Sequence, residues 1–342
     1  MAISRNSRIL PVVLATTGYW LCAPTLSASP VANLPYSLSV FARSGNGYSQ
    51  PDSIVQWKDS IFVGFQNHVA KDGTDNKSST IVQYSLDGKV QRMFSVPGHN
   101  DGLRVVGETS LWSLQNEDAN PNLVVIDLES GHQKLYIFAP TPHGGGYDDI
   151  VVQNNQVYLT ASNPNTPGGI NIFPALVRAT LQGDMVVVTP VLYGNANAVD
   201  IPSGAVAPLN LTDPDSLAID PRGNIVLNSQ ADSELVFIRN VSSNSRLVGL
   251  LKIRTAAGPV TLDDTAFTPS SNAFALFSDV GFDTIYRLDN RQFGFEPGTA
   301  YSTSDTAGII GVLNLDNGLL TPIASGFSST RGMIFVQPDI VE

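Results

Sequence analysis

Five aspartates recur along the chain. Each opens a short segment in which one small or polar residue is followed by three mostly apolar ones. The copies start at Asp52, Asp101, Asp148, Asp215 and Asp263, and a sixth copy starts with Arg331 in place of aspartate. The steps between successive copies are 49, 47, 67, 48 and 68 residues. If the fold brings these carboxylates together, they can act as general acids and bases, or bind a hard cation through oxygen atoms.

The segments after each copy have the pattern of short strands joined by tight turns. A second apolar run follows within a few residues, as in residues 61–65 after the turn at Asp59-Ser60. Asp87-Gly88 and Asn317-Gly318 are hairpin turn pairs, because both positions tolerate positive φ. No segment keeps a 3.6-residue apolar period, so we expect almost no helix.

The spacing of the copies predicts the fold class. The shorter steps match a four-stranded propeller blade, which takes about 40–50 residues and buries its faces against its neighbours. We therefore predict an all-β, six-bladed β-propeller whose last blade is completed by Tyr36–Ser44, so that N- and C-terminal strands close the ring. The long steps predict insertions near 163–174 or 192–212, and near 289–308. Seven blades remain an alternative, because Thr284–Leu288 does not fit the repeat.

In a propeller the first strand of each blade lines the central channel, so the six opening residues should form a ring at one mouth. Loops that reach this mouth add the candidate substrate-binding residues, which are Asn100, Asn116, Glu117, His68 and, from the ring, Arg331. A confined ring of carboxylates needs a counter-charge. Because the donors are oxygens, we predict a divalent cation, with Ca²⁺ favoured. The alternative is that the aspartates cap strands and accept backbone N–H groups.

Two segments carry a resemblance to a known family. Residues 213–226 (DPDSLAIDPRGNIV) resemble the blade signature of gluconolactonase/regucalcin-like proteins, and His99-Asn100-Asp101-Gly102 resembles their Asn-Asp-Gly segment. The resemblance implies a six-bladed propeller with one divalent cation in the channel mouth that hydrolyses lactones or other esters. By position Asp52 replaces the family's glutamate ligand, Asn100 matches the asparagine on the substrate side, and Asp215 matches the ligand aspartate. The rhythm is also similar to strictosidine-synthase-like and NHL-type propellers.

The ring and the resemblance together give the candidate site. The expected metal ligands are Asp52, Asp148, Asp215 and Asp263. The expected catalytic base is Asp215 or Asp101, or else His99 or His143. Two other functions stay open: a metal-independent tailoring or cyclisation step of a natural-product pathway, and a non-catalytic propeller that binds a ligand.

The N-terminus and the composition predict where the protein works. Arg5 and Arg8, an apolar run at residues 9–21 and small residues near Ala28 have the order of a secretory signal peptide, shorter than a membrane span. We expect a secreted protein, periplasmic in a Gram-negative source, with a single domain at 29–342. The net charge of −11 becomes −13 once both arginines are removed, which argues against nucleic acid and anionic membranes as partners. The expected partner is a small molecule, and the expected state a monomer.

Three sequons offer modification sites, at Asn76, Asn210 and Asn240. If the host glycosylates them, they mark exposed loops. The single cysteine, Cys22, lies in the predicted signal segment. Stability must then come from a large core rather than from disulfides.

Overall fold

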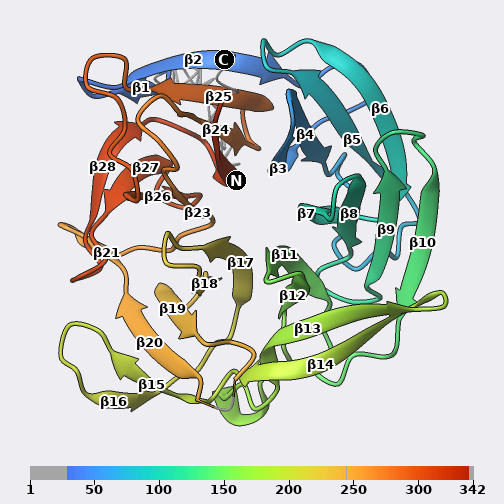
Figure 1. The fold of residues 1–342 in the computed structure, drawn as a ribbon, viewed down its shortest axis with the longest axis vertical. Coiled ribbons are helices and arrows are strands. Elements are labelled where there is room, and N and C mark those ends of the chain that lie inside the picture. The colour runs from blue at the N-terminus through green and yellow to red at the C-terminus, as the bar shows by residue number, and fades with distance from the viewer. Residues whose placement is uncertain (1–28, 244, 339–342) are drawn as a thin grey trace, which may run out of the picture.

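The structure is a computed structural model that describes residues 29–243 and 245–338. The predicted signal segment, residues 1–28, lies outside the described residues. Six four-stranded blades stand around a central axis, each with one strand next to the channel (Figure 1). This confirms the predicted six-bladed propeller, and the described residues form no seventh blade. Their one helix is the short 3-10 turn Pro167–Gly169, so none of them form a helix able to cross a membrane.

Blades 1 to 3 follow the chain from the channel outward. Blade 1 contains β3 (Pro51–Trp57), β4 (Ser60–Phe65), β5 (Ser78–Ser85) and β6 (Val90–Pro97). Blade 2 contains β7 (Asn100–Val106), β8 (Ser110–Gln115), β9 (Asn122–Asp127) and β10 (Gln133–Phe138). Blade 3 contains β11 (Tyr147–Gln153), β12 (Gln156–Ala161), β13 (Pro174–Gln182) and β14 (Met185–Tyr193). The outer strands β10 and β14 pair in parallel, which joins blades 2 and 3 into one eight-stranded sheet.

Blade 4 contains the hairpin that explains the first long step. Its four strands are β17 (Pro214–Ile219), β18 (Ile225–Ser229), β19 (Glu234–Arg239) and β20 (Leu247–Lys252). The hairpin β15 (Asn197–Asp200) and β16 (Val206–Pro208) adds to the outer edge of β20. This hairpin lies in the predicted insertion at 192–212. A small hairpin, β21 (Arg254–Thr255) and β22 (Gly258–Pro259), leads to the next blade.

Blades 5 and 6 exchange strands. Blade 5 starts with β23 (Thr265–Phe267), and the chain then leaves for blade 6 to form β24 (Phe274–Asp279) and β25 (Thr284–Asp289). It returns to blade 5 for β26 (Ala300–Ser304), β27 (Ile309–Leu313) and β28 (Leu320–Ser325), and it ends in blade 6 with β29 (Thr330–Val336). The predicted insertion near 289–308 is therefore wrong. The step of 68 residues from Asp263 to Arg331 is long because it contains β24 and β25. Residues Thr284–Leu288, which did not fit the repeat, lie in β25 of the last blade.

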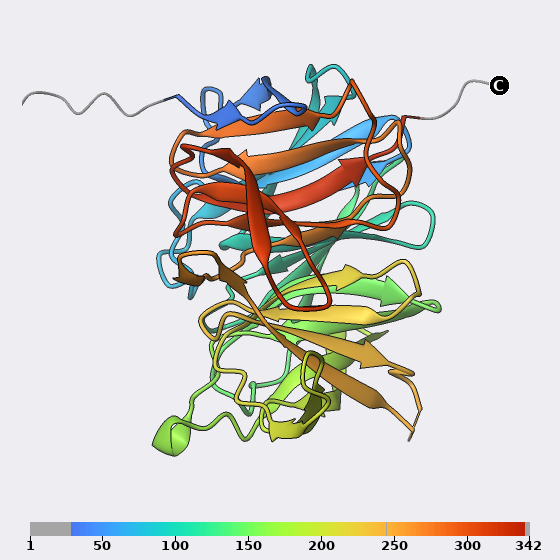
Figure 2. The same cartoon turned by 90° about the vertical axis from the view of Figure 1, so that its left-hand side faces the viewer.

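Strands from both ends of the chain close the ring. β2 (Ser37–Arg43) is the outer strand of blade 6, where it pairs with β25 (Figure 1). β1 (Val31–Ala32) pairs with β28 at the outer edge of blade 5. The predicted closure by Tyr36–Ser44 is confirmed. Figure 2 shows the same ring from the side, turned so that the left-hand side of Figure 1 faces the viewer.

The core lies between the blades. Six clusters of buried apolar side chains fill the six interfaces between neighbouring blades. Between blades 1 and 2, for example, Phe62 and Ile81 pack with Leu103 and Leu111. Because each sheet buries its faces only against its neighbours, the whole ring is needed to complete the core.

A β-bulge lies at the repeated motif of the channel strands. In β3, β7, β11 and β17 the pairing skips the motif's first two residues, as between Pro51 and Ile54 of β3, and β29 has the same shift. A bulge releases two consecutive residues from the ladder. The first residue of each motif then points into the mouth, and the second contacts the channel strand of the next blade.

The second motif residue ties neighbouring channel strands together. Asp149 accepts a hydrogen bond from the Leu217 backbone N–H at 2.7 Å, and Asp264 accepts one from Met333 N–H at 2.6 Å. The sequence left open that the aspartates accept hydrogen bonds from backbone N–H groups. The aspartates at the second motif position have this role. The ring aspartates instead face the channel mouth.

Where the second residue is glycine, the strands approach closely. A Cβ atom on Gly102 would lie 2.3 Å from the backbone carbonyl oxygen of Asp148. We expect Gly102→Ala to lower the free energy of unfolding by about 1–3 kcal/mol, because the two channel strands must move apart. Urea denaturation measures this. Ser53→Ala, at the same motif position in blade 1, is the matched control and should change stability by less than about 0.5 kcal/mol. Equal stability of Gly102→Ala and wild type would contradict the close approach.

Candidate functional site

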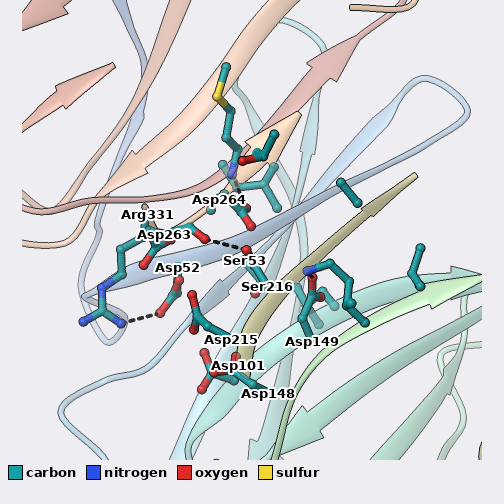
Figure 3. A pocket seen from close by; sticks show the side chains of 18 of the residues that line it. Asp52, Ser53, Asp101, Asp148, Asp149, Asp215, Ser216, Asp263, Asp264 and Arg331 are labelled. Atoms are coloured by element: carbon teal, nitrogen blue, oxygen red, sulfur yellow. Dashed lines mark hydrogen bonds and ion pairs between the residues drawn. The ribbon is translucent and has the colours of Figure 1, made fainter. Parts of the chain in front are cut away.

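The mouth of the channel opens into a cavity of about 430 Å³. The first residue of each of the six motif copies lines this cavity. The ring aspartates come from five different blades, and their side chains are drawn in Figure 3. Its acidic lining residues are Asp52, Asp101, Glu117, Asp118, Asp148, Asp149, Asp213, Asp215, Asp263 and Asp264. Its basic lining residues are Lys71, Arg104 and Arg331. Acidic groups outnumber basic ones, so the site suits a cation, a proton donor or a hydroxylated ligand.

Asp52 is neutralised within the protein. Its Oδ2 accepts a hydrogen bond from Arg331 Nη1 at 3.0 Å, and Gln66 Nε2 donates to the same oxygen. Arg331 opens β29 and Asp52 lies in β3, so this ion pair joins the channel strands of the first and last blades. With its charge already compensated, Asp52 is poorly suited to bind a cation.

Asp148 and Asp215 are neighbouring acids in the mouth whose ionisation is linked. Burial and the nearby Asp215 charge raise the pKa of Asp148 well above its usual range, and burial and the Asp263 charge do the same for Asp215. Two neighbouring acids that both resist ionisation favour a state with one shared proton, with Asp148 as its donor and Asp215 as its acceptor. Asp148 is buried, whereas Asp215 is partly exposed to the cavity. This pair provides one proton donor and one proton acceptor.

The other two ring aspartates differ in how well they are satisfied. Asp263 Oδ1 accepts a hydrogen bond from Gln230 Nε2 at 3.2 Å. Asp101 Oδ2 is buried and has no hydrogen-bond partner. Burial raises the pKa of both carboxyls, and for Asp101 the neighbouring charges of Asp148 and Glu117 add to the effect.

His99, Asp101 and Glu117 gather their ligand atoms at one edge of the cavity. One nitrogen or oxygen of each lies within 4.8 Å of those of the other two, and all three residues are buried. His99 Nδ1 lies 2.8 Å from the carbonyl oxygen of Val69. A carbonyl only accepts, so Nδ1 holds the proton in the neutral ring, and Nε2 has a free lone pair. His99 Nε2 lies 3.8 Å from Glu117 Oε1 and has no hydrogen-bond partner.

This geometry differs from the ligand set expected from the sequence. Among the described residues, the group of at least three that could hold an ion is His99, Asp101 and Glu117. The predicted ligands Asp52, Asp148, Asp215 and Asp263 line the cavity but do not form such a group. The difference arises because Asp52 pairs with Arg331, and Asp148 with Asp215.

Four other candidate residues lie at the mouth end of the blades but not in the cavity lining. His143 is buried with Nε2 2.8 Å from Gly146 O, and burial lowers the pKa of its imidazole. Asn100 donates to Ser113 Oγ, and Asn116 accepts from His99 N–H, so both amides hold the backbone in place. His68 is exposed outside the cavity. The predicted catalytic role of His143 and the predicted substrate-binding roles of the other three stay predictions, for side chains that lie outside the cavity lining.

Several charged lining residues were not singled out from the sequence, among them Asp149, Asp264 and Lys71. Asp149 and Asp264 follow ring aspartates directly, and the Asp-Asp doublet was their only signal. Lys71 lies in the connection between β4 and β5, residues 66–77. The length of this connection could have pointed to Lys71, because a long loop that follows a strand ending at the mouth can reach the cavity.

The three sequon asparagines are exposed. The Asn210 amide accepts from Asn171 N–H and donates to Gly169 O, both at 2.9 Å. Glycosylation of Asn76, Asn210 and Asn240 stays a prediction.

Comparison with known proteins gives matches only among solved structures. No protein-family model matches the chain, and no curated protein matches it. Virginiamycin B lyase from Staphylococcus aureus is 13% identical, with 82% of this chain and 86% of that chain covered and a TM-score of 0.49. A periplasmic gluconolactonase from Pseudomonas aeruginosa is 12% identical, with 84% and 88% covered and a TM-score of 0.45. A protein of unknown function from Bacteroides thetaiotaomicron is 10% identical, with 87% and 69% covered and a TM-score of 0.51.

The likeness is one of fold. At such low identity a shared propeller does not define the reaction, since one fold hosts many activities. The function has to be argued from the side chains of this propeller's own mouth.

Proposed function

We propose that this propeller is a hydrolase that cleaves a small lactone or ester in the channel mouth. The observation that carries the proposal is the placement of two neighbouring acids with raised pKa values, Asp148 and Asp215, in the lining of a cavity of about 430 Å³. Hydrolysis of an ester needs one group to take a proton from water and another to give a proton to the leaving oxygen. A carboxyl pair with one proton supplies both.

The roles follow from the proton's position. Asp215, the acceptor, removes a proton from water as its oxygen attacks the ester carbonyl carbon, and a tetrahedral intermediate forms. The carbon–oxygen bond to the leaving group then breaks, and Asp148 gives its proton to the departing oxygen. A lactone opens to a hydroxy acid. Asp215 then returns a proton to Asp148, which restores the pair.

A divalent cation fits this mouth at His99, Asp101 and Glu117. His99 Nε2 and Asp101 Oδ2 are buried acceptors without donors, which are the groups that an ion would satisfy. One nitrogen and two carboxylates suit Zn²⁺ or Mn²⁺ better than the Ca²⁺ expected from the sequence, because Ca²⁺ takes oxygen ligands. When bound, the ion would polarise the ester carbonyl. Secretion and the monomeric state stay predictions from the sequence.

A panel of lactones and aryl esters tests the proposal. We expect the purified protein to hydrolyse at least one of them, and a chelator to slow the reaction about 100-fold, the usual scale for loss of oxyanion stabilisation. Zn²⁺ or Mn²⁺ should restore the rate better than Ca²⁺. Rates no higher than in buffer for the whole panel would overturn the hydrolase. Activity that resists chelation would overturn the role of the cation in hydrolysis but not the role of the carboxyl pair.

A further inference from the structure

The proposed cation site already has a positive charge at its edge. Lys71 Nζ forms an ion pair with Glu117 Oε1, the oxygen that also lies 3.8 Å from His99 Nε2. The Lys71 side chain is 47% exposed, whereas that of Glu117 is 10% exposed. The Glu117 carboxylate is therefore shared between the half-exposed ammonium of Lys71 and the buried ligand atoms of His99 and Asp101.

The group is incomplete with Lys71 alone. His99 Nε2 and Asp101 Oδ2 are buried and have no hydrogen-bond partner, although each of the two residues has a ligand atom within 4.8 Å of one of Glu117. Buried acceptors without donors are costly. Lys71 thus neutralises one carboxylate and leaves the nitrogen and the other carboxylate free, so the site keeps its capacity for an ion.

Lys71 can leave the site without a change in its loop. Its backbone is held by a hydrogen bond of 3.2 Å from Asp118 N–H to the Lys71 carbonyl oxygen. The loop is also joined to the next blade by Asn120 Nδ2, which donates to the Asp72 carbonyl oxygen at 3.1 Å. The long flexible side chain, already half in solvent, can rotate away from Glu117 while these bonds remain.

We infer that Lys71 and a divalent cation compete for Glu117, so that the lysine is a tethered counter-ion that sets the metal affinity of the site. The inference rests on the cation of the proposed function. An ion bound to Glu117 Oε1 would lie next to the ammonium, and two positive charges so close repel. Binding of the ion therefore requires Lys71 to give up its ion pair, which weakens metal binding.

Metal titration of Lys71→Met tests the competition. Co²⁺ is the probe, because its visible absorption reports nitrogen and carboxylate ligation directly. We expect Lys71→Met to bind Co²⁺ at least about tenfold more tightly than wild type, since the methionine keeps the apolar stem but not the charge. Lys71→Arg should stay close to wild type. Lys77→Met is the matched control, because Lys77 lies in the same loop and pairs with Asp75 outside the cavity.

The outcome is independent of catalysis, because the readout is the Co²⁺ spectrum and the dissociation constant. His99→Ala in the Lys71→Met background should remove the tight binding and so locate the ion. Equal affinity of wild type and Lys71→Met would overturn the competition, even if metal-dependent hydrolysis is found. Tighter binding by Lys71→Met would support it, even if no lactone is cleaved. Absence of Co²⁺ binding in every variant would overturn the site itself.

Discussion

An Asp215→Asn variant should hydrolyse its ester about 1,000-fold more slowly than wild type and yet unfold at a higher urea concentration at pH 8. The loss of rate follows because the amide cannot take a proton from water, and general bases contribute about 100- to 10,000-fold. The gain in stability follows because the variant removes an acid whose ionised form is disfavoured by burial and by its acidic neighbours. Steady-state rates and urea denaturation measure the two effects.

The pH dependence gives the sign of the stability change. The folded pKa values of Asp148 and Asp215 are raised, so between the unfolded pKa and the folded pKa the folded state holds more protons than the unfolded state. Stability is then highest at the acidic end of this window and falls as the pH rises through it. At pH 8 the asparagine amide can donate to Asp148 without any titratable proton. We expect a gain of about 1–3 kcal/mol there, shrinking toward pH 4.

An exposed aspartate provides the control. Asp59→Asn, in the turn between β3 and β4, should change neither the rate nor the pH dependence of stability. If Asp215→Asn kept full activity, the base would be another residue. If it lowered stability at pH 8, the description of a shared proton would be wrong.

Arg331→Met should lower the free energy of unfolding by about 3–5 kcal/mol, the cost of removing one partner from a buried ion pair. Arg331 donates to Asp52 and opposes the effect of burial on the pKa of Asp263. Without it, both acids lose their compensating charge in a mouth that is already crowded with carboxylates. Urea denaturation at pH 7 measures the loss.

A double-mutant cycle separates charge from packing. Asp52→Asn combined with Arg331→Met should recover part of the stability, because the carboxylate that lost its partner is gone. Arg331→Lys should fall between wild type and Arg331→Met, since it keeps the charge but loses the planar guanidinium. Additive effects of Asp52→Asn and Arg331→Met would contradict a coupled ion pair.

The six channel strands could be predicted from the sequence because each one carries a copy of the repeated motif. Asp52 and its counterparts lie at a bulge in the channel strands, so the motif and the strand recur together. The blade membership of β24 and β25 was not predicted. Spacing counts residues along the chain, whereas β24 pairs with β29, whose residues come more than 50 positions later.

The site was predicted in outline but not in its pairings. Residues that open channel strands must meet at one mouth, and this placed all five aspartates around one cavity. Which carboxylate contacts Arg331 and which shares a proton depends on distances across the channel, and these are not encoded in periodicity. The orientation of His143 could not be predicted for a related reason, since a residue near the mouth can still turn its ring toward its own loop.

The strand exchange between blades 5 and 6 bears on how the chain matures during synthesis. Once β23 has left the ribosome, its sheet neighbours β26–β28 are still to come, and β24 and β25 wait for β29. The N-terminal strands wait as well, β2 until its partner β25 is made and β1 until its partner β28 is made. Blades 1 to 4 can assemble in order of translation, but about the final quarter of the nascent polypeptide, from β23 onward, has to fold as one interlocked unit.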